Sequence, residues 1–229
     1  MIKIMMEASM FRSFVLVCAF CFMGWIGSLQ ALSEPYQSLP KLLPYDDMGW
    51  YSNAEPMEQL VRERKPKVVI ELGSWLGKST RHIAQIIPKD GIVYAVDHWL
   101  GSVEHHATQF SKYLPTLYDQ FLSNVIHTKL TDKIIPVRMT TLQAVNEFVA
   151  RNIVPDLIYV DASHDEESVY KDLVAYYPLV KGHGILCGDD WGWGNGFPVQ
   201  MAVRRFAKEQ NLQIEIPNGW FWILREAKR

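Results

Sequence analysis

The sequence predicts an α/β fold, a mostly parallel sheet of seven strands with helices on both faces. Between residues 67 and 190, short runs rich in β-branched residues alternate with longer helical segments. Gly, Pro, Lys or Asp bounds each of these runs. Such alternation is typical of crossover connections between parallel strands. With 229 residues, 48% of them apolar, the chain is long enough for a single domain with a full core.

The predicted elements follow from these runs in chain order. The strands are 67–72, 91–97, 133–138, 155–161 and 183–190, with two further strands at 212–216 and 220–225. The segments long enough for crossover helices are 77–87, 114–128, 141–151 and 165–180, and another helix is predicted near 198–210. Thr140 and Gln143 form the capping-box pattern expected at the start of helix 141–151.

Residues 1–31 differ from the rest of the chain and predict a signal peptide or membrane anchor. Lys3 and Arg12 precede an almost uncharged stretch, 13–31, which ends in small and polar side chains. A buried helix is the alternative, because apolar spans of this length are ambiguous. With a working signal or anchor the protein is exported or membrane-associated through residues 13–31. Without one it is cytoplasmic.

The remaining chain divides into a linker with an N-terminal helix, 32–60, and the main domain, 61–229. Of the three cysteines only Cys187 lies in this part, so no disulfide framework is expected, and its apolar neighbours predict an inert core cysteine. The formal net charge is −2, and no basic stripe is present. We therefore expect no nucleic-acid partner and favour a small or weakly charged ligand, with the oligomeric state left open.

The stretch "ELGSWLGKST", residues 71–80, is the most informative turn. A phosphate-binding P-loop has four residues between its glycines, whereas Gly73 and Gly77 enclose three. A dinucleotide fingerprint requires a second glycine where this chain has Trp75, and the backbone could not approach a pyrophosphate there. The remaining pattern, acid-x-Gly-x-x-x-Gly, favours a nucleoside that carries a small zwitterion.

Acidic residues gather where the predicted strands end, which is where doubly wound sheets bind their ligands. Parallel strands lie about 4.8 Å apart, so carboxylates that end neighbouring strands can converge on one cation. Three carboxylates with waters would suit Mg²⁺. The alternative is that only Asp161 matters and the other acids are solvated. The strand-end candidates are Glu71, Gly73, Gly77, Asp97, residues 138–141, residues 161–164, Asp189 and Asp190.

Four segments in this order, "ELGSWLGKST", "VYAVD", "DLIYVDASH" and "GILCGDDW", resemble the class I S-adenosylmethionine-dependent methyltransferases. The resemblance is strongest to the branch with catechol O-methyltransferase-like metal sites and to macrolide-sugar O-methyltransferases, and it spans roughly residues 45–225. It implies a Rossmann-like fold, S-adenosylmethionine as cofactor, Mg²⁺, and a small hydroxylated acceptor. The chain departs from the usual pattern at Trp75, where many members carry glycine.

The resemblance also implies roles for individual residues. Asp97 would accept the ribose hydroxyl protons, and the two glycines would let the backbone approach the methionine portion. His164 would be the catalytic base, with a cap or surface histidine as the alternative, and Asp161 would be both catalytic and a metal ligand. The implied cofactor-binding residues are Glu71, Gly73, Ser74, Gly77, Asp97, His98 and Thr140. The implied metal ligands are Asp161, Asp189 and Asp190.

The sequence therefore predicts an enzyme, a methyltransferase that transfers a methyl group to oxygen with help from a divalent cation. Two other functions stay open. A P-loop-like nucleotide hydrolase is disfavoured by the loop length, and a non-catalytic nucleoside- or metal-binding module is favoured by the export-like N-terminus, because S-adenosylmethionine is made in the cytosol.

Overall fold

Seven strands form one sheet in residues 32–226, the part of the chain that this computed structural model describes. The strand order is β3-β2-β1-β4-β5-β7-β6. The first five strands pair in parallel, and β7 runs antiparallel to both β5 and β6. The strands are β1 Val68–Leu72, β2 Ile92–Asp97, β3 Ile134–Arg138, β4 Leu157–Val160, β5 Ile185–Gly188, β6 Leu212–Glu215 and β7 Trp222–Glu226. The predicted fold class is confirmed.

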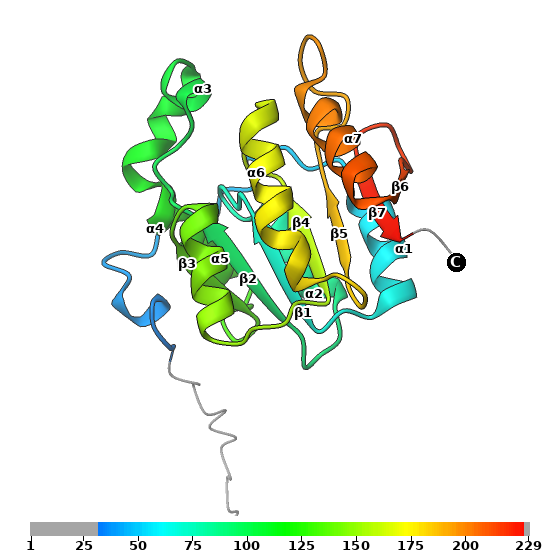
Figure 1. The fold of residues 1–229 in the computed structure, drawn as a ribbon. Coiled ribbons are helices and arrows are strands. Elements are labelled where there is room, and N and C mark those ends of the chain that lie inside the picture. Colours follow the sequence, from blue (N-terminus) through cyan, green and yellow to red (C-terminus); the bar gives the residue numbers. More distant parts are fainter. Residues whose placement is uncertain (1–31, 227–229) are drawn as a thin grey trace, which may run out of the picture. The chain divides into compact units, whose positions relative to one another are not determined.

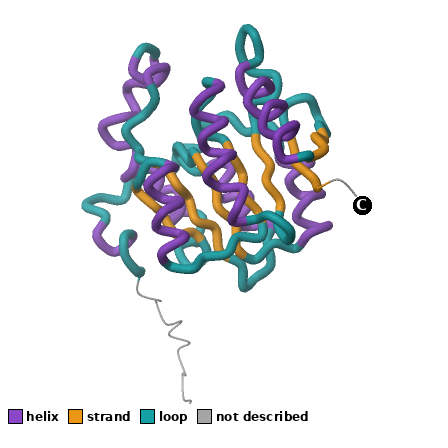
Figure 2. Tube along the Cα trace, in the orientation of Figure 1, coloured by secondary structure: helices purple, strands orange, loops and turns teal. Residues whose placement is uncertain are grey.

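Helices cover both faces of the sheet, and Figure 1 shows α5, α6 and α7 in front of it. The helices on this face are α5 Thr141–Ala150, α6 Glu166–Tyr176 and α7 Pro198–Gln210. The other face is covered by α1 Ala54–Arg64, α2 Lys78–Ile86 and α4 Leu117–His127. Figure 2 shows the same layers around the strands. The shorter helices are α3 Val103–His106 and the 3₁₀ segments η1 Tyr36–Ser38, η2 Gln109–Thr116 and η3 Tyr177–Leu179.

The central strands are apolar on both sides because each face of the sheet meets a helix layer. Strands β4 and β5 are buried at every position. Tyr159 and its register partner Cys187 point into one core cluster, and Ile158 and its partner Leu186 point into the other. Cys187 is buried in the core, as the sequence predicted, and it is a free cysteine within residues 32–226.

Two boundaries differ from the prediction. Helix α1 continues to Arg64, so it crosses the boundary placed after residue 60. Residues 98–113, for which no helix or strand was predicted, contain α3 and the start of η2. Short helical turns of this kind lack the length over which an apolar period can be recognised.

The predicted signal peptide or anchor, residues 1–31, lies outside the described residues. Within residues 32–226, none of the helices combines the length and the apolar character required to cross a bilayer.

Asp172 on α6 gives a prediction about stability. Its side chain is only 4% exposed, and burial raises the pKa of its carboxyl to about 6. The folded state therefore keeps this proton at a pH where the unfolded chain, with an ordinary pKa of about 3.9, has lost it. The free energy of unfolding should fall by roughly 2–3 kcal/mol as the pH rises from about 4 to above 6.

Asp172→Asn should remove this fall in the free energy of unfolding at higher pH, because the amide does not ionise. We expect the variant to gain stability over the wild type at pH 8 but not at pH 4, as measured by urea denaturation. Asp132→Asn, at an exposed position, is the control and should leave the pH dependence unchanged. An unaltered pH profile for Asp172→Asn would contradict the assignment.

Candidate active site

The larger cavity, about 870 Å³, lies where the parallel strands end. In Figure 1, α3 and the loop after β5 project at this edge of the sheet. Five acidic side chains line the cavity with only one lysine, so its walls are strongly acidic. The lining residues that carry charge or a titratable ring are Lys78, Asp97, Glu104, His105, Asp161, His164, Asp189 and Asp190.

The loop between β1 and α2 passes very close to the end of β4. Gly73 has a φ of +86°, and a Cβ built on it would collide with the backbone carbonyl of Asp161. Gly77, at φ +80°, begins α2, and its Cβ would lie 2.8 Å from the ring of Phe121. Both positions therefore require glycine. Gly73 lines the cavity, whereas Gly77 does not.

Asp97, at the end of β2, organises this loop. One carboxylate oxygen accepts the backbone N–H groups of Ser74 at 3.2 Å and Trp75 at 3.0 Å. The other accepts the N–H of Trp99 at 2.6 Å. Asp97 and Ser74 both line the cavity. The carboxylate thus holds three amides in place at the position where the sequence predicted ribose binding.

Glu71 supports the loop from within the protein. It is completely buried and does not line the cavity. Oε2 accepts the hydroxyl of Ser74 at 2.7 Å and that of Thr80, while Oε1 is buried with no partner among the described residues. Burial raises the pKa of its carboxyl. Glu71, implied above to bind the cofactor, thus bonds to side-chain hydroxyls of the loop and of α2, and any cofactor role for it stays a prediction.

Besides Glu71 and Gly77, two further predicted cofactor residues, His98 and Thr140, lie outside the cavity lining. Thr140 and Gln143 form the capping box of α5, which confirms the structural interpretation of Thr140. His98 accepts the N–H of Leu100 through Nδ1 at 3.0 Å. Its neighbour Trp99 is 1% exposed and belongs to the core. Any cofactor role for His98 or Thr140 stays a prediction.

The strand-end acids come together as predicted. Asp161, Asp189 and Asp190 all line the cavity. Burial raises the pKa of Asp161 well above its usual range, and the charges of Asp189 and then Asp190 raise it further. Asp189 accepts the hydroxyl of Tyr159 at 3.1 Å and the N–H of Asp190 at 2.7 Å. Asp190 adopts a left-handed φ of 63°, a conformation that Asp tolerates.

His164 lies between two carboxylates. Its Nε2 is 3.0 Å from Oδ2 of Asp190, and its Nδ1 is 3.2 Å from Oε2 of Glu104. The ring packs 4.7 Å from that of Trp193. Burial opposes the charged imidazolium, but the hydrogen bond to Asp190 and the charges of both acids outweigh burial and raise the pKa of His164. Because both ring nitrogens face carboxylates, one of these contacts must open before His164 can take a proton from a substrate hydroxyl.

A possible cation site differs from the predicted one by a single residue. Among residues 32–226, Asp161, His164 and Asp190 offer ligand atoms that all lie within 4.8 Å of one another. Asp189 does not belong to this group. Carboxylate oxygens and an imidazole nitrogen are both common ligands of divalent metals, so the donor set fits a cation.

Helix α3 and η2 cover one side of the cavity through aromatic contacts. The ring of His105 stacks on Trp75 with a centroid distance of 4.2 Å, and burial lowers the pKa of His105, which favours the neutral ring. Phe110 meets Trp50 edge-on at 4.7 Å. The segment 102–116, named here the α3–η2 segment, is thus held by ring packing and by the Glu104–His164 contact.

Sequence reasoning missed the contribution of residues 49–52, which were assigned to a linker. Trp50, Tyr51 and Ser52 line the cavity. The hydroxyl of Tyr51 lies 2.9 Å from Nδ1 of His82, whose Nε2 is 3.3 Å from Glu58. The adjacent aromatic residues Trp50 and Tyr51 in "MGWYSN" were the available signal. No local pattern, however, indicates that they lie near the strand ends.

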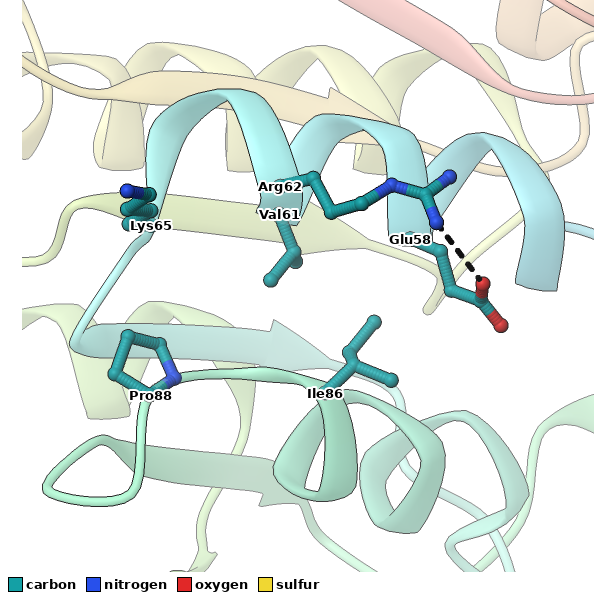
Figure 3. A pocket seen from close by; sticks show the side chains of 6 residues that line it. All are labelled: Glu58, Val61, Arg62, Lys65, Ile86 and Pro88. Carbon is teal, nitrogen blue, oxygen red and sulfur yellow. Dashed lines mark ion pairs between the residues drawn. The ribbon is translucent and has the colours of Figure 1, made fainter.

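A second hollow, about 400 Å³, lies between α1 and α2 and is shown in Figure 3. Val61, Ile86 and Pro88 give it apolar walls, and an ion pair of 3.9 Å joins Arg62 to Glu58. It contains none of the residues predicted to act on a cofactor, metal or substrate.

Comparison with known proteins agrees with this architecture. A family model described as a methyltransferase domain matches residues 70–191, more than half of the chain. The chain therefore belongs to this methyltransferase family, which confirms the resemblance stated above and the assignment as an enzyme. No curated protein sequence matches the chain.

Solved structures share the fold at low sequence identity. An O-methyltransferase from Bacillus cereus in complex with SAH is 17% identical, with a TM-score of 0.57 over 80% of this chain and 83% of the other. A putative caffeoyl-CoA O-methyltransferase from Staphylococcus aureus is 17% identical, with a TM-score of 0.56 over 79% and 85%. The O-methyltransferase TomG from Streptomyces achromogenes, in complex with SAM, is 14% identical, with a TM-score of 0.57 over 87% and 93%.

Gly73→Ala tests the close approach of the β1–α2 loop to β4. Gly182 is a matched control, because its φ of +83° is nearly the same and nothing lies within 4 Å of the point that a Cβ would occupy there. Both substitutions incur the cost of a left-handed alanine, about 1–2 kcal/mol. Only Gly73→Ala also overpacks the loop against β4, which typically costs a further 1–3 kcal/mol. We therefore expect Gly73→Ala to lose about 1–3 kcal/mol more stability than Gly182→Ala. Urea denaturation of both variants measures it, and equal losses would show that the loop is free to move.

Proposed function

We propose that this enzyme transfers a methyl group from S-adenosylmethionine to a hydroxyl oxygen of a small acceptor, with the assistance of a divalent cation. The observation that carries the proposal is the acidic cavity itself, in which Asp97 and the glycine loop lie beside the clustered strand-end carboxylates. Two proteins of the same fold, described as O-methyltransferases, are in complex with SAH or SAM.

The donor would lie across the β1–α2 loop. Asp97 already orders the amides of Ser74 and Trp75, and its carboxylate is the group suited to accept ribose hydroxyl protons. Gly73 lines the cavity, and because it has no Cβ the loop backbone can pass against the end of β4. When bound, S-adenosylmethionine supplies an electrophilic methyl group on a sulfonium, whose positive charge matches the acidic walls.

The acceptor would lie beside the strand-end acids. A divalent cation, when bound, lowers the pKa of a hydroxyl that it contacts. Asp161 and Asp190 are the carboxylates that would hold it. The exposed rings of Trp193 and Trp220, 41% and 44% exposed, line the same cavity and offer flat apolar surfaces to an acceptor. The α3–η2 segment would shield this side from water.

The nucleotide-hydrolase alternative receives no support from the β1–α2 loop. Lys78, the only lysine of the cavity lining, contacts the carbonyl of Gly49 at 3.3 Å and lies 3.8 Å from Asp47. Its charge is thus partly balanced by protein groups, and no other lysine or arginine lines the described cavity to bind phosphates.

Calorimetric titration of the full chain with S-adenosylhomocysteine and with ATP tests the donor assignment. The wild type should bind S-adenosylhomocysteine and not ATP. Asp97→Ala should weaken binding by about 100-fold or more, since charged hydrogen bonds of roughly 1.5–3 kcal/mol each are lost. Binding of ATP alone would overturn the proposal.

Two further variants separate ligand binding from loop structure. Asp97→Asn keeps an oxygen for the amides of Ser74 and Trp75 but removes the negative charge, so it should bind more tightly than Asp97→Ala and less tightly than the wild type. Asp90→Ala, which removes a surface aspartate paired with Lys67, should leave the affinity unchanged. Circular dichroism checks that each variant is folded.

A further inference from the structure

We propose that His82 is a positioning residue of the donor site, which holds the hydroxyl of Tyr51 and decides, through its own protonation, whether Tyr51 offers the cavity an oxygen acceptor or an O–H donor. The inference rests on the proposed binding of S-adenosylmethionine. Its starting point is a hydrogen-bonded chain of three side chains, Glu58, His82 and Tyr51, which runs from α1 through α2 to the cavity wall.

This chain has one end at the cavity and the other in solvent. Tyr51 lines the cavity, and its hydroxyl oxygen lies 2.9 Å from Nδ1 of His82. The centroids of the two rings are 5.4 Å apart. Nε2 of His82 is 3.3 Å from Oε1 of Glu58, whose side chain is 42% exposed. His82 does not itself line the cavity, so it would act on a ligand through Tyr51.

Hydrogen-bond chemistry fixes the direction of each contact while His82 is neutral. A carboxylate only accepts hydrogen bonds, so Nε2 of His82 carries the proton that faces Glu58. Nδ1 of the neutral ring then has a lone pair and accepts the hydroxyl proton of Tyr51. Because its proton is used in this bond, the phenol oxygen can present only lone pairs to the cavity.

Protonation of His82 reverses the contact with Tyr51. Both nitrogens of an imidazolium donate, so Nδ1–H would donate to the phenol oxygen and free the hydroxyl proton to turn toward the cavity. The phenol does not ionise instead, because burial, and then the charges of Glu71 and Asp189, raise the pKa of the Tyr51 hydroxyl above its ordinary value. Tyr51 therefore changes from an acceptor to a donor as His82 gains its charge.

Tyr51 lies in the part of the cavity that suits a positively charged group of the donor. The acids whose charges act on its hydroxyl, Glu71, Asp189 and Asp161, lie at the ends of the neighbouring strands β1, β5 and β4. S-adenosylmethionine and S-adenosylhomocysteine both carry an ammonium group, which donates hydrogen bonds and requires acceptors. Neutral His82 leaves the Tyr51 oxygen as an acceptor, whereas charged His82 occupies that oxygen and adds a like charge.

Residues 47–51 are fixed to α2, the helix that carries His82. Asp47 pairs with Arg81 at 2.6 Å and lies 3.8 Å from Lys78. Lys78 also donates to a backbone carbonyl of this segment at 3.3 Å. Because these contacts hold the segment on the helix, the hydroxyl proton of Tyr51 can change direction while the ring keeps its place.

The charged groups around His82 come from two helices. From α1, Glu58 faces Nε2, and Arg62 lies 3.9 Å from the other carboxylate oxygen of Glu58. On α2 itself, Lys78 and Arg81 bind residues 47–51. Among the residues that the structure describes, Glu58 is thus the charged group in contact with the ring, and its carboxylate favours the imidazolium.

The test is calorimetric titration of the full chain with S-adenosylhomocysteine at about pH 8 and about pH 5, a range across which histidine changes its charge. The affinity of the wild type should fall at the lower pH, and that of His82→Asn should fall about 10-fold less. Asparagine is the suitable substitute because its Oδ1 can accept the Tyr51 hydroxyl in place of Nδ1 but does not titrate. At the higher pH the two proteins should bind about equally.

Two further variants test whether His82 acts through Tyr51. Tyr51→Phe keeps the ring but removes the hydroxyl, so it should weaken binding at the higher pH by about 10-fold and reduce the effect of His82→Asn on the pH dependence. Glu58→Gln should move the fall in affinity to lower pH, because a carboxylate stabilises the charged imidazole. His183→Asn, which alters an exposed histidine before β5, is the control and should leave the pH dependence unchanged.

The proposal is overturned if His82→Asn keeps the wild-type pH dependence, or if Tyr51→Phe binds S-adenosylhomocysteine as tightly as the wild type at the higher pH. Either result, obtained with folded variants and a wild type that binds the ligand, would leave the donor assignment standing. Failure of S-adenosylhomocysteine to bind the folded wild type would instead overturn the donor assignment, and this inference with it.

Discussion

Repulsion among carboxylates at the edge where the parallel strands end is the constraint on which this site depends. The topology places Glu71, Asp161 and Asp189 at the ends of β1, β4 and β5, which are neighbours in the sheet. Burial raises the pKa of all three carboxyls, and the charges of nearby acids raise each pKa further. Each acid must therefore be neutralised or given hydrogen-bond donors, and the surrounding structure differs from one acid to the next.

The donors divide the acids into distinct tasks. Hydroxyl groups of Ser74 and Thr80 bind Glu71, so this acid shapes the loop rather than the cavity wall. The phenol of Tyr159 binds Asp189. Asp190 has the imidazole of His164 as its partner. Chemically similar side chains within one small region thus acquire different properties, because aliphatic hydroxyls, a phenol and an imidazole stabilise a carboxylate to different extents.

The sheet and the position of the site could be predicted from the sequence, since β-branched runs mark the strands and parallel strands end at one edge. Residues 49–52 could not, because their contacts with the strand ends depend on packing between distant segments. The contact between His164 and Glu104 could not be predicted either, because the two residues are 60 positions apart in the chain. The different surroundings of the adjacent acids Asp189 and Asp190 could not be predicted either, because the left-handed backbone of Asp190 and the hydrogen bond from Tyr159 to Asp189 leave no local pattern.

The place of β7 between β5 and β6 has a consequence for how the protein is made. Of the seven strands β7 comes latest in the chain, yet it pairs with both neighbours, and the ring of Trp222 occupies the space left free by Gly188. Until a ribosome has released residues 222–226, β5 presents an unpaired edge, and the carbonyl of Asp189 lacks its indole donor. A nascent chain that stops short of β7 therefore exposes a template for aggregation and leaves the catalytic edge unfinished.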